Sequence, residues 1–471
     1  MKDLSYKAVM ARQNDIIRQA VGLDYAQFER PDHTFDYEGL MASVPYKIQE
    51  IQEILKSLHV GDTPLIYLDN ITALVRKIAP EGKGAQIYIK DEAANPSGSF
   101  KARRAALSVY EAKRLGYKGV IAATSGNYGA AVASMAAKLG LKCIVVQECF
   151  DSRRVGQPEI LEKQRKCEAL GAEVIQLTVG PELFYETLKL LEETGFYNAS
   201  LYTATAIAGV ESLGYEIIQQ GMGLFGRHPD YVIATNAGGG NLTGTARGLR
   251  LAGANDTKIY AASVDLSGLH MASDHDFNRK SFTTGHTGFG IPFTVQPDRS
   301  DVPRNAARPL RYMDNYMTLK QGEVFFITET LAALEGMERG PAGNTSLAAA
   351  FALAKTLDQD QIIVVQETEY TGAGKHPMPQ LSFARENGIE IRLGDPEEEV
   401  PGKNIILPDH PSKIKARFWD MATLRKSALK RLTAPMGEEI SKDQAQYLEA
   451  EVHCDQDFLH QTLAEFGKQV V

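Results

Sequence analysis

From Thr63 onward, short β-rich runs alternate with amphipathic segments of helical length. Such alternation is typical of βαβ units, in which parallel strands form a sheet and the connecting helices cover both of its faces. The sequence therefore predicts an α/β protein, and the spacing of the runs predicts two open parallel sheets with a cleft between them. The strand-like runs are Gln86–Lys90, Gly119–Ala122, Cys143–Gln147, Glu173–Leu177, Tyr231–Thr235, Ile259–Val264 and Ile362–Gln366.

Changes in this pattern divide the 471 residues into four parts. At roughly 150 residues per domain, a chain of this length is expected to form two or three domains. Residues 1–60 mix charges with helical periodicity and predict a helical N-terminal extension. Residues 61–104 together with 226–395 are expected to form a large domain and residues 105–225 a small domain. Residues 396–471 are highly charged and predict a C-terminal extension suited to subunit contact.

Composition and charge exclude several classes of protein. Lys and Arg number 51 against 59 Asp and Glu, and the formal net charge of −8 gives no electrostatic attraction to nucleic acid or to an anionic membrane. No stretch reaches the ~18 apolar residues of a membrane helix, and the N-terminus lacks the apolar region of a signal peptide. The 4 cysteines have no CxxC spacing, so neither a disulfide framework nor a zinc site is expected. We therefore expect a cytoplasmic protein.

A turn rich in Ser and Gly, residues 95–100, follows the first strand-like run and precedes a helix that begins near Lys101. Ser97 or Ser99 is a suitable cap for that helix. A lysine in the first turn is electrostatically unfavourable, because the N-terminus of a helix already carries partial positive charge. This position should lower the pKa of Lys101, as a lysine that forms a Schiff base requires. The alternative interpretation is an ordinary solvated lysine.

A second turn follows the run that ends at Ala122. Glycines in this turn let backbone N–H groups approach a ligand, and the N-terminus of the following helix suits a carboxylate. An ordinary strand-to-helix turn is the alternative interpretation. The turn contains Thr124, Ser125, Gly126, Asn127, Tyr128 and Gly129, with its glycines at positions 126 and 129.

A third turn follows Tyr231–Thr235 and contains three consecutive glycines at the start of a helix. Free N–H groups, the lack of Cβ atoms and the positive end of the helix dipole make such a turn a phosphate site. A dinucleotide fingerprint is the alternative, but Thr243 stands where that fingerprint needs Gly or Ala. The residues predicted to bind phosphate are Gly238, Gly239, Gly240 and Asn241.

A lysine amine, a carboxylate site and a phosphate site are together the parts that hold pyridoxal 5′-phosphate and an amino acid. Thr63–Leu65, Asn95–Lys101, Ser125–Gly129 and Gly238–Asn241 resemble, in this order, the signatures of the fold-type II pyridoxal-phosphate enzymes, the superfamily of tryptophan synthase β and threonine synthase. This resemblance implies that the cofactor lies in the interdomain cleft, held mainly by the large domain. It also implies that Lys101 forms the internal aldimine, Asn127 contacts the 3′-oxygen, and the second and third turns receive the substrate carboxylate and the cofactor phosphate.

The resemblance further implies a Ser or Thr beside the pyridine nitrogen, just after the strand-like run Ile362–Gln366. Thr368 is favoured by its distance from the run, and Thr371 by the Gly372-x-Gly374 that follows it. Both residues stay open at this point. A hydroxyl in this position would leave the ring nitrogen unprotonated and weaken the electron sink.

A wider resemblance runs from residue 1 to about residue 415. The segments ANPSGSFKARRAA, ATSGNYGAAVAS, NAGGGNLTGTARGL and QETEYTGAGKHPMPQLSFARENGIEIR are similar to the family of 2-amino-4-oxopentanoate thiolase β subunits. This resemblance implies an acyltransferase of ornithine degradation that works with a thiolase α subunit in a hetero-oligomer. The implied reaction converts 2-amino-4-oxopentanoate and coenzyme A into acetyl-CoA and alanine.

Three questions stay open in this interpretation. The thiolate that accepts the acetyl group is either coenzyme A itself or a cysteine, for which Cys149 at the end of a predicted strand is the candidate, unless it is a buried structural thiol. The glycine-rich segment 285–290 is either a lid that brings His286 near the cofactor or a plain surface loop. The alternative functions are a lyase that eliminates or replaces at the β carbon of serine, threonine or a diamino acid, and a cofactor-binding subunit that is inactive without its partner.

Overall fold

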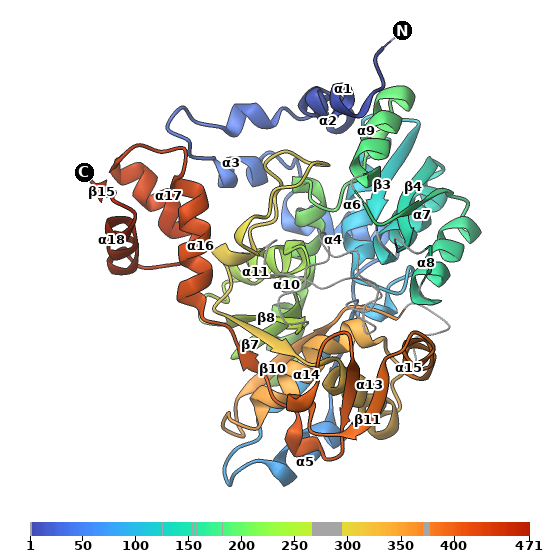
Figure 1. Ribbon diagram of the computed structural model, residues 1–471, viewed down its shortest axis with the longest axis vertical. Coiled ribbons are helices and arrows are strands. Elements are labelled where there is room, and N and C mark those ends of the chain that lie inside the picture. Colours follow the sequence, from blue (N-terminus) through green and yellow to red (C-terminus); the bar gives the residue numbers. More distant parts are fainter. Residues whose placement is uncertain are drawn as a thin grey trace.

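The computed structural model contains two main sheets and two small ones among the residues it describes (Figure 1). This confirms the prediction of an α/β protein with parallel sheets, and each predicted strand-like run is a strand. The described residues are 2–124, 126–151, 154–156, 158–180, 182–265, 294–370 and 377–471.

The smaller main sheet is entirely parallel, with the strand order β5-β4-β3-β6. All six residues of β3 are buried, because helices cover both faces of this central strand. α6 and α7 pack on one face, while α9 packs on the other and is itself covered by α1 and α2. The elements are α1 (Tyr6–Ala11), α2 (Gln13–Val21), α6 (Lys101–Arg114), β3 (Gly119–Thr124), α7 (Asn127–Leu139), β4 (Lys142–Phe150), α8 (Pro158–Ala169), β5 (Glu173–Thr178), α9 (Glu182–Thr194) and β6 (Tyr197–Asn198).

The larger sheet has the order β1-β2-β10-β7-β8-β9-β13, in which the two edge strands are antiparallel and the inner strands are parallel. β10 is buried along its whole length, as expected for an apolar run at the centre of a parallel sheet. The strands are β1 (Leu65–Tyr67), β2 (Gln86–Asp91), β7 (Tyr231–Thr235), β8 (Lys258–Val264), β9 (Asn315–Leu319), β10 (Ile362–Glu367) and β13 (Arg417–Phe418).

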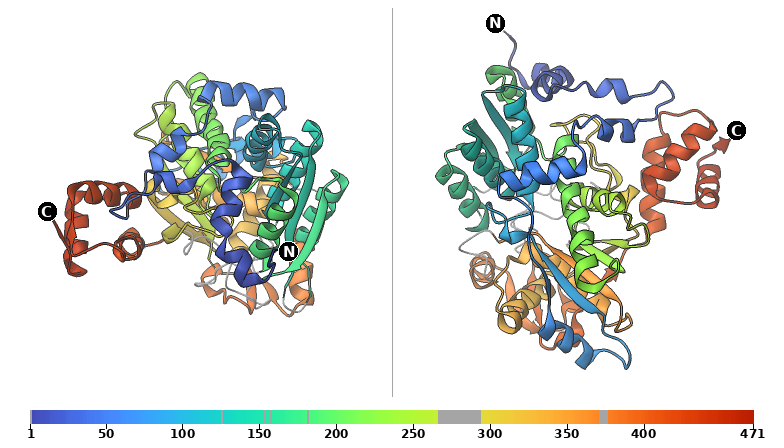
Figure 2. Two further views of the ribbon diagram at one scale, coloured as in Figure 1. Left: turned by 90° about the horizontal axis from the view of Figure 1, so that it is seen from above. Right: turned by 180° about the vertical axis from the view of Figure 1, so that it is seen from behind.

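Helices cover both faces of the larger sheet and form separate apolar cores there. α5, α13 and α14 pack on one face, and α14 is apolar almost all round because it lies between the sheet and α13. α10 and α11 pack against each other on the other face (Figure 2, right). The helices are α5 (Asp69–Ile78), α10 (Ala204–Phe225), α11 (Gly240–Leu251), α13 (Gln321–Glu335) and α14 (Pro341–Ala354). A further helix, α15 (Pro377–Glu386), packs on α8 and α13.

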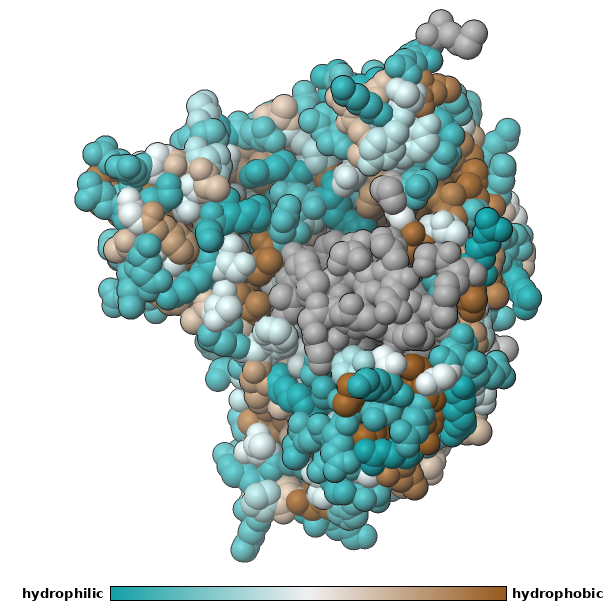
Figure 3. Space-filling view, viewed as in Figure 1, coloured by the Kyte–Doolittle hydropathy of each residue, from teal (hydrophilic) through white to brown (hydrophobic). Residues whose placement is uncertain are grey.

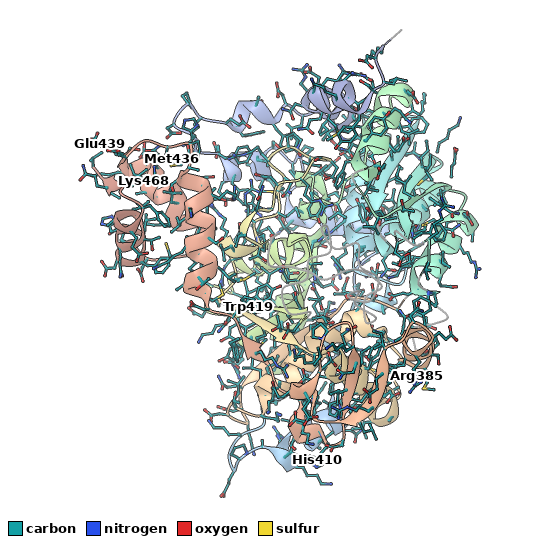
Figure 4. All side chains as sticks on the ribbon, viewed as in Figure 1. Arg385, His410, Trp419, Met436, Glu439 and Lys468 are labelled. Atoms are coloured by element: carbon teal, nitrogen blue, oxygen red, sulfur yellow. The ribbon has the colours of Figure 1, made fainter. Side chains whose placement is uncertain are left out.

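The chain leaves β13 at Trp419 and ends in a helical unit that projects from one side of the molecule (Figures 1 and 4). At the far end of this unit the Lys468 ammonium donates hydrogen bonds to the carbonyls of Met436 and Gly437. The elements of this unit are α16 (Met421–Thr433), β14 (Glu439–Ile440), α17 (Lys442–Val452), α18 (Gln456–Glu465) and β15 (Gln469–Val470). Before β13, the chain forms β11 (Glu390–Gly394) and β12 (Asn404–Pro408).

The part of the chain after residue 395 contributes two strands to the body of the molecule. β12 pairs with β11, and β13 completes the larger sheet beside β9, where Arg417 forms an ion pair with the buried Glu323. The domain boundaries at residues 60, 104, 225 and 395 stay a prediction.

The surface in Figure 3 is mainly hydrophilic among the described residues, with hydrophobic residues in separate small patches. In the described ranges, every helix is too short or too polar to cross a bilayer.

At the N-terminal side of the body lie α3 (Tyr37–Ala42) and α4 (Ile48–Ser57), and α4 packs on α6 and α10.

Candidate active site

One cavity lies where the carboxyl ends of β3, β7 and β10 meet the first turns of α6, α7 and α11. Parallel sheets present their ligand sites at this edge, because loops and helix N-termini converge there. The cavity brings together most of the predicted site residues, from both main sheets. These residues are Lys101, Gly126, Asn127, Tyr128, Gly238, Gly239, Gly240, Asn241 and Thr368.

Five predicted residues are not placed on this cavity. Ser125 and Thr371 lie outside the described residues, as does His286. Gly129 packs behind the cavity wall, where a Cβ atom would lie 2.8 Å from side-chain atoms of Thr124 and Val145. Cys149 is only 3% exposed and is absent from the described cavity lining, although the preceding residue, Glu148, is part of it.

Lys101 is the first residue of α6, and its ammonium lies 3.8 Å from a carboxylate oxygen of Glu369. Burial lowers the pKa of Lys101 to about 8, while Glu369 opposes this shift. The low pKa agrees with the expectation, but its largest cause is burial and not the helix dipole that the sequence suggested. The N-cap is Phe100 and makes no side-chain cap bond, so the expectation that Ser97 or Ser99 caps α6 is wrong.

The second turn places Asn127 at the start of α7 with its side chain almost fully buried. The Asn127 amide nitrogen donates to Glu369, and its oxygen Oδ1 has no hydrogen-bond partner among the described residues. Lys163 from α8 packs against Gly126 and forms an ion pair of 2.5 Å with Glu159. A cation therefore lies beside the turn that was predicted to receive a carboxylate.

The third turn leaves space that side chains would fill. A Cβ atom at Gly238 would overlap the hydroxyl of Tyr202, and a Cβ atom at Gly239 would overlap Pro309. Gly239 also has φ +84°, a left-handed conformation that favours glycine. α11 begins at the next residue, so its first backbone N–H groups have no partner within the helix. The geometry is suited to an anion.

Thr368 and Glu369 follow the end of β10 and line the cavity. The carbonyl of Thr368 accepts a hydrogen bond of 3.1 Å from the Phe100 N–H, which fixes this segment against the start of α6. Glu367 is fully buried, and burial together with the nearby carboxylates of Asp91 and Glu369 raises its pKa well above the usual range. Glu367 therefore holds a proton more readily than an ordinary carboxyl group does.

Several lining residues were missed by the sequence analysis. Arg104 and Glu369 had a signal, because Arg104 follows Lys101 by one helical turn and Glu369 lies between the two threonines that were considered. Glu148 lies on β4 beside Cys149, which had been considered. The remaining residues had no such signal, since they come from loops and a helix far away in the sequence. The missed residues are Arg104, Glu148, Lys163, Tyr202, Arg299, Asp301 and Glu369.

Residues 56–369 match the family model described as pyridoxal-phosphate dependent enzyme. The chain is 64% identical over 465 residues to the 2-amino-4-ketopentanoate thiolase beta subunit of Acetoanaerobium sticklandii, covering 98% of this chain and 99% of the relative. It is 59% identical over 467 residues to a protein of the same name from an unknown prokaryotic organism, covering 99% of both chains.

The fold is also similar to that of solved structures. A pyridoxal 5′-phosphate-dependent aspartate racemase superposes with a TM-score of 0.56 at 18% identity, covering 71% of this chain and 98% of the racemase. At this identity the likeness concerns the fold alone.

Proposed function

Since this chain belongs to the pyridoxal-phosphate dependent enzymes and, within them, to the 2-amino-4-ketopentanoate thiolase β subunits, we propose that it cleaves 2-amino-4-ketopentanoate (2-amino-4-oxopentanoate) with coenzyme A. The products are acetyl-CoA and alanine. The observation that carries this proposal is the 64% identity over 98% of the chain. Its cofactor is pyridoxal 5′-phosphate.

The cavity residues fit this cofactor. Asn127 and Asn241 each have a buried amide oxygen without a partner among the described residues, and Gly238 and Gly239 keep open the space beside α11. We assign Lys101 to the aldehyde and Asn127 to the 3′-oxygen. The phosphate is assigned to residues 238–241, the substrate carboxylate to residues 125–129, and the pyridine nitrogen to Thr368 or Thr371.

The reaction breaks the C3–C4 bond of the substrate and forms a bond between C4 and the thiol sulfur. The thiol loses one proton, and C3 gains one. When bound, the cofactor supplies an electron sink next to the carbon that carries the amino group. Lys101 takes the proton from C2 and later returns one there. Because its pKa is about 8, a useful fraction of its amine is neutral near physiological pH.

Coenzyme A itself is the better acyl acceptor of the two alternatives. Cys149 is buried, and burial raises the pKa of its thiol to about 12. A thiol of this kind supplies almost no thiolate near neutral pH, and the thiolate is the nucleophile. We therefore propose direct thiolysis, without an acetylated cysteine.

The relatives are β subunits by name, and we propose that this chain works with an α subunit in a hetero-oligomer. Residues 396–471 are the proposed contact region, because their helical unit projects from the body (Figure 1). Cys143, Cys149, Cys167 and Cys454 are all free thiols, which fits a reducing cytoplasm.

Product analysis with the α partner present tests this function. The complex should form acetyl-CoA and alanine in equal amounts from 2-amino-4-ketopentanoate, and only when coenzyme A is supplied. Solvent deuterium should enter both C2 and C3 of the alanine, because both carbons are protonated after cleavage. Ammonia and a keto acid released from serine or threonine without coenzyme A would show an eliminating lyase instead. Deuterium at C2 alone would exclude a carbanion at C3.

A further inference from the structure

Among the described residues, four basic side chains line the cavity, and three of them have a carboxylate nearby. The Lys101 ammonium lies 3.8 Å from a carboxylate oxygen of Glu369, and the Lys163 ammonium lies 2.5 Å from one of Glu159. The Nε atom of Arg299 lies 3.9 Å from a carboxylate oxygen of Asp301. The fourth, Arg104, forms no ion pair with any residue in the described part of the chain.

Arg104 is nevertheless almost fully buried, with 3% of its surface exposed. One Nη atom donates a long hydrogen bond of 3.3 Å to the carbonyl of Leu201, and the guanidinium lies 5.1 Å from the centre of the Phe100 ring. Its Nε has no hydrogen-bond partner among the described residues. Burial lowers the pKa of Arg104 to about 10, which reflects the cost of an uncompensated charge in this position.

The guanidinium of Arg104 lies against the first turn of α11. Its two Nη atoms are 3.0 and 3.2 Å from the position that a Cβ atom on Gly240 would take. The same turn carries the backbone N–H groups that have no partner within the helix. Two independent features therefore meet on one wall of the cavity: the helix N-terminus, and a buried guanidinium that has no counter-ion among the described residues.

We propose that Arg104 is the side-chain counter-ion of the cofactor phosphate, which completes a site otherwise made of backbone N–H groups. The phosphate is a dianion at neutral pH and accepts two parallel hydrogen bonds from a guanidinium. This assignment depends on the pyridoxal-phosphate cofactor and not on the thiolase reaction. It gives Arg104 a positioning role that is distinct from the proton transfer assigned to Lys101.

Two other anions compete for Arg104 in principle, the substrate carboxylate and the phosphates of coenzyme A. The carboxylate is assigned to residues 125–129, where Lys163 already supplies a cation beside Gly126. Arg104 instead lies beside Gly240, on the phosphate turn, where its Nη atoms would meet a Cβ atom on that residue. The position of the guanidinium thus favours the cofactor phosphate.

The test compares two aldehydes that differ only in the phosphate. The apoprotein of the full chain is titrated with pyridoxal 5′-phosphate and with pyridoxal, without coenzyme A, in wild type and Arg104→Met. Charge-assisted hydrogen bonds of this kind correspond to a loss of about tenfold to 100-fold in affinity when they are removed. Arg104→Met should weaken pyridoxal 5′-phosphate by at least tenfold and change the affinity for pyridoxal by less than about twofold.

Inorganic phosphate gives a second measurement without the aldehyde. It should raise the melting temperature of the wild-type apoprotein and have a much smaller effect on Arg104→Met. If Arg104→Met does not fold, Arg104→Lys decides the question: an ammonium cannot form the two parallel bonds, so the affinity for the phosphate ester should fall by about threefold to tenfold while that for pyridoxal holds.

Arg299→Met is the matched control, because Arg299 lines the same cavity but lies beside Asp301. It should leave the ratio of the two affinities unchanged. Equal losses for both aldehydes in Arg104→Met would overturn the proposal, as would unchanged affinity for both. A variant that binds pyridoxal 5′-phosphate normally but has lost affinity for alanine or coenzyme A would assign Arg104 to those ligands instead.

Discussion

Arg103 and Arg104 are neighbours on α6, and both are buried, but they face opposite kinds of environment. Arg103 Nε lies 2.8 Å from Glu92, and its Nη1 lies 3.0 Å from Glu216. The two carboxylates raise the pKa of Arg103 against the effect of burial. Arg104 has no such partner among the described residues, and burial lowers its pKa. α6 thus separates a region in which buried charges form ion pairs from the cavity, where the charge of Arg104 has no ion pair among the described residues.

The paired region has a structural role. Lys90 from β2 donates to the backbone carbonyl of Thr63 and to the side chain of Glu216 on α10, so this cluster joins the larger sheet to α6 and α10. Its ion pairs lower the pKa of Glu216 to about 2. On the cavity side, amide oxygens of Asn127 and Asn241 have no hydrogen-bond partner, and Arg104 has no ion pair, within the part of the chain that the structure describes. The contrast teaches that buried polar groups satisfied within the chain hold the fold, whereas unsatisfied ones mark where a ligand binds.

The largest effect is expected on the cavity side, for Lys101→Ala. Turnover should fall by more than about 1,000-fold, because both the covalent attachment of the cofactor and the proton transfer at C2 are lost. The visible absorbance of the bound cofactor should disappear, while the apoprotein should melt within a few degrees of wild type. Borohydride reduction followed by peptide mapping checks the attachment site. A reduced cofactor adduct that persists in the variant would place the reactive lysine elsewhere.

The second largest effect is expected on the paired side, for Arg103→Met. Removing one partner from a buried ion pair leaves uncompensated charge and typically costs about 3 to 5 kcal/mol. The free energy of unfolding, measured with urea, should fall by that amount. The control is Arg18→Met: Arg18 and Asp15 form an ion pair of 2.9 Å with side chains half or more exposed, so the change should stay below about 1 kcal/mol.

This prediction also tests whether the two regions are separable. If Arg103→Met lost cofactor affinity without losing stability, the paired cluster would be part of the binding site and the comparison would fail. A loss of stability below about 1 kcal/mol would contradict the structural role directly.

The sequence predicted the strands and the glycine turns because these features are local. β7 begins and ends at the predicted residues, and Lys101, Gly238 and Asn241 meet in one cavity as the order of motifs implied. The edge strands β1 and β13 have three and two residues, too few to show a period of two. They form because neighbouring strands offer backbone partners, which no local pattern reports.

Side chains that reach the cavity from distant segments were beyond prediction for the same reason. Tyr202 and Asp301 approach from loops, and only tertiary packing brings them to residues 238–241. The cause of the low pKa of Lys101 was also missed. The largest cause is burial, and burial depends on the closed cavity, which only tertiary packing forms. The motif residues could therefore be predicted from the sequence, whereas the lining residues from distant segments and the burial of Lys101 could not.

The third prediction concerns pH and tests whether the pKa of Lys101 is lower than that of an ordinary lysine. Covalent capture of pyridoxal phosphate needs the neutral amine, and burial lowers the pKa of Lys101 from 10.5 to about 8. The capture rate should rise about tenfold per pH unit below pH 8 and level off above it. Stopped-flow absorbance of the apoprotein between pH 6.5 and 10 checks the profile. A rate that still rises tenfold from pH 9 to pH 10 would indicate an ordinary lysine.

Glu369→Gln sharpens this measurement. The Glu369 carboxylate raises the pKa of Lys101, so its neutralisation should move the midpoint to lower pH. A midpoint that moves upward would show that Glu369 does not act on Lys101 as a nearby negative charge.

The smallest effect is expected for Cys149→Ala, which tests whether a buried thiol of the small sheet belongs to the fold or to the reaction. Direct thiolysis by coenzyme A predicts that kcat for acetyl-CoA formation stays within about twofold of wild type, because a thiol with a pKa of about 12 is not a nucleophile near neutral pH. Cys454→Ala, which removes a partly exposed thiol of the C-terminal unit, is the control. Mass spectrometry of wild type incubated with substrate but without coenzyme A should show no acetyl adduct. Loss of turnover in Cys149→Ala together with an acetylated Cys149 in wild type would establish the relay. Cys149 would then be a catalytic residue and not a structural one.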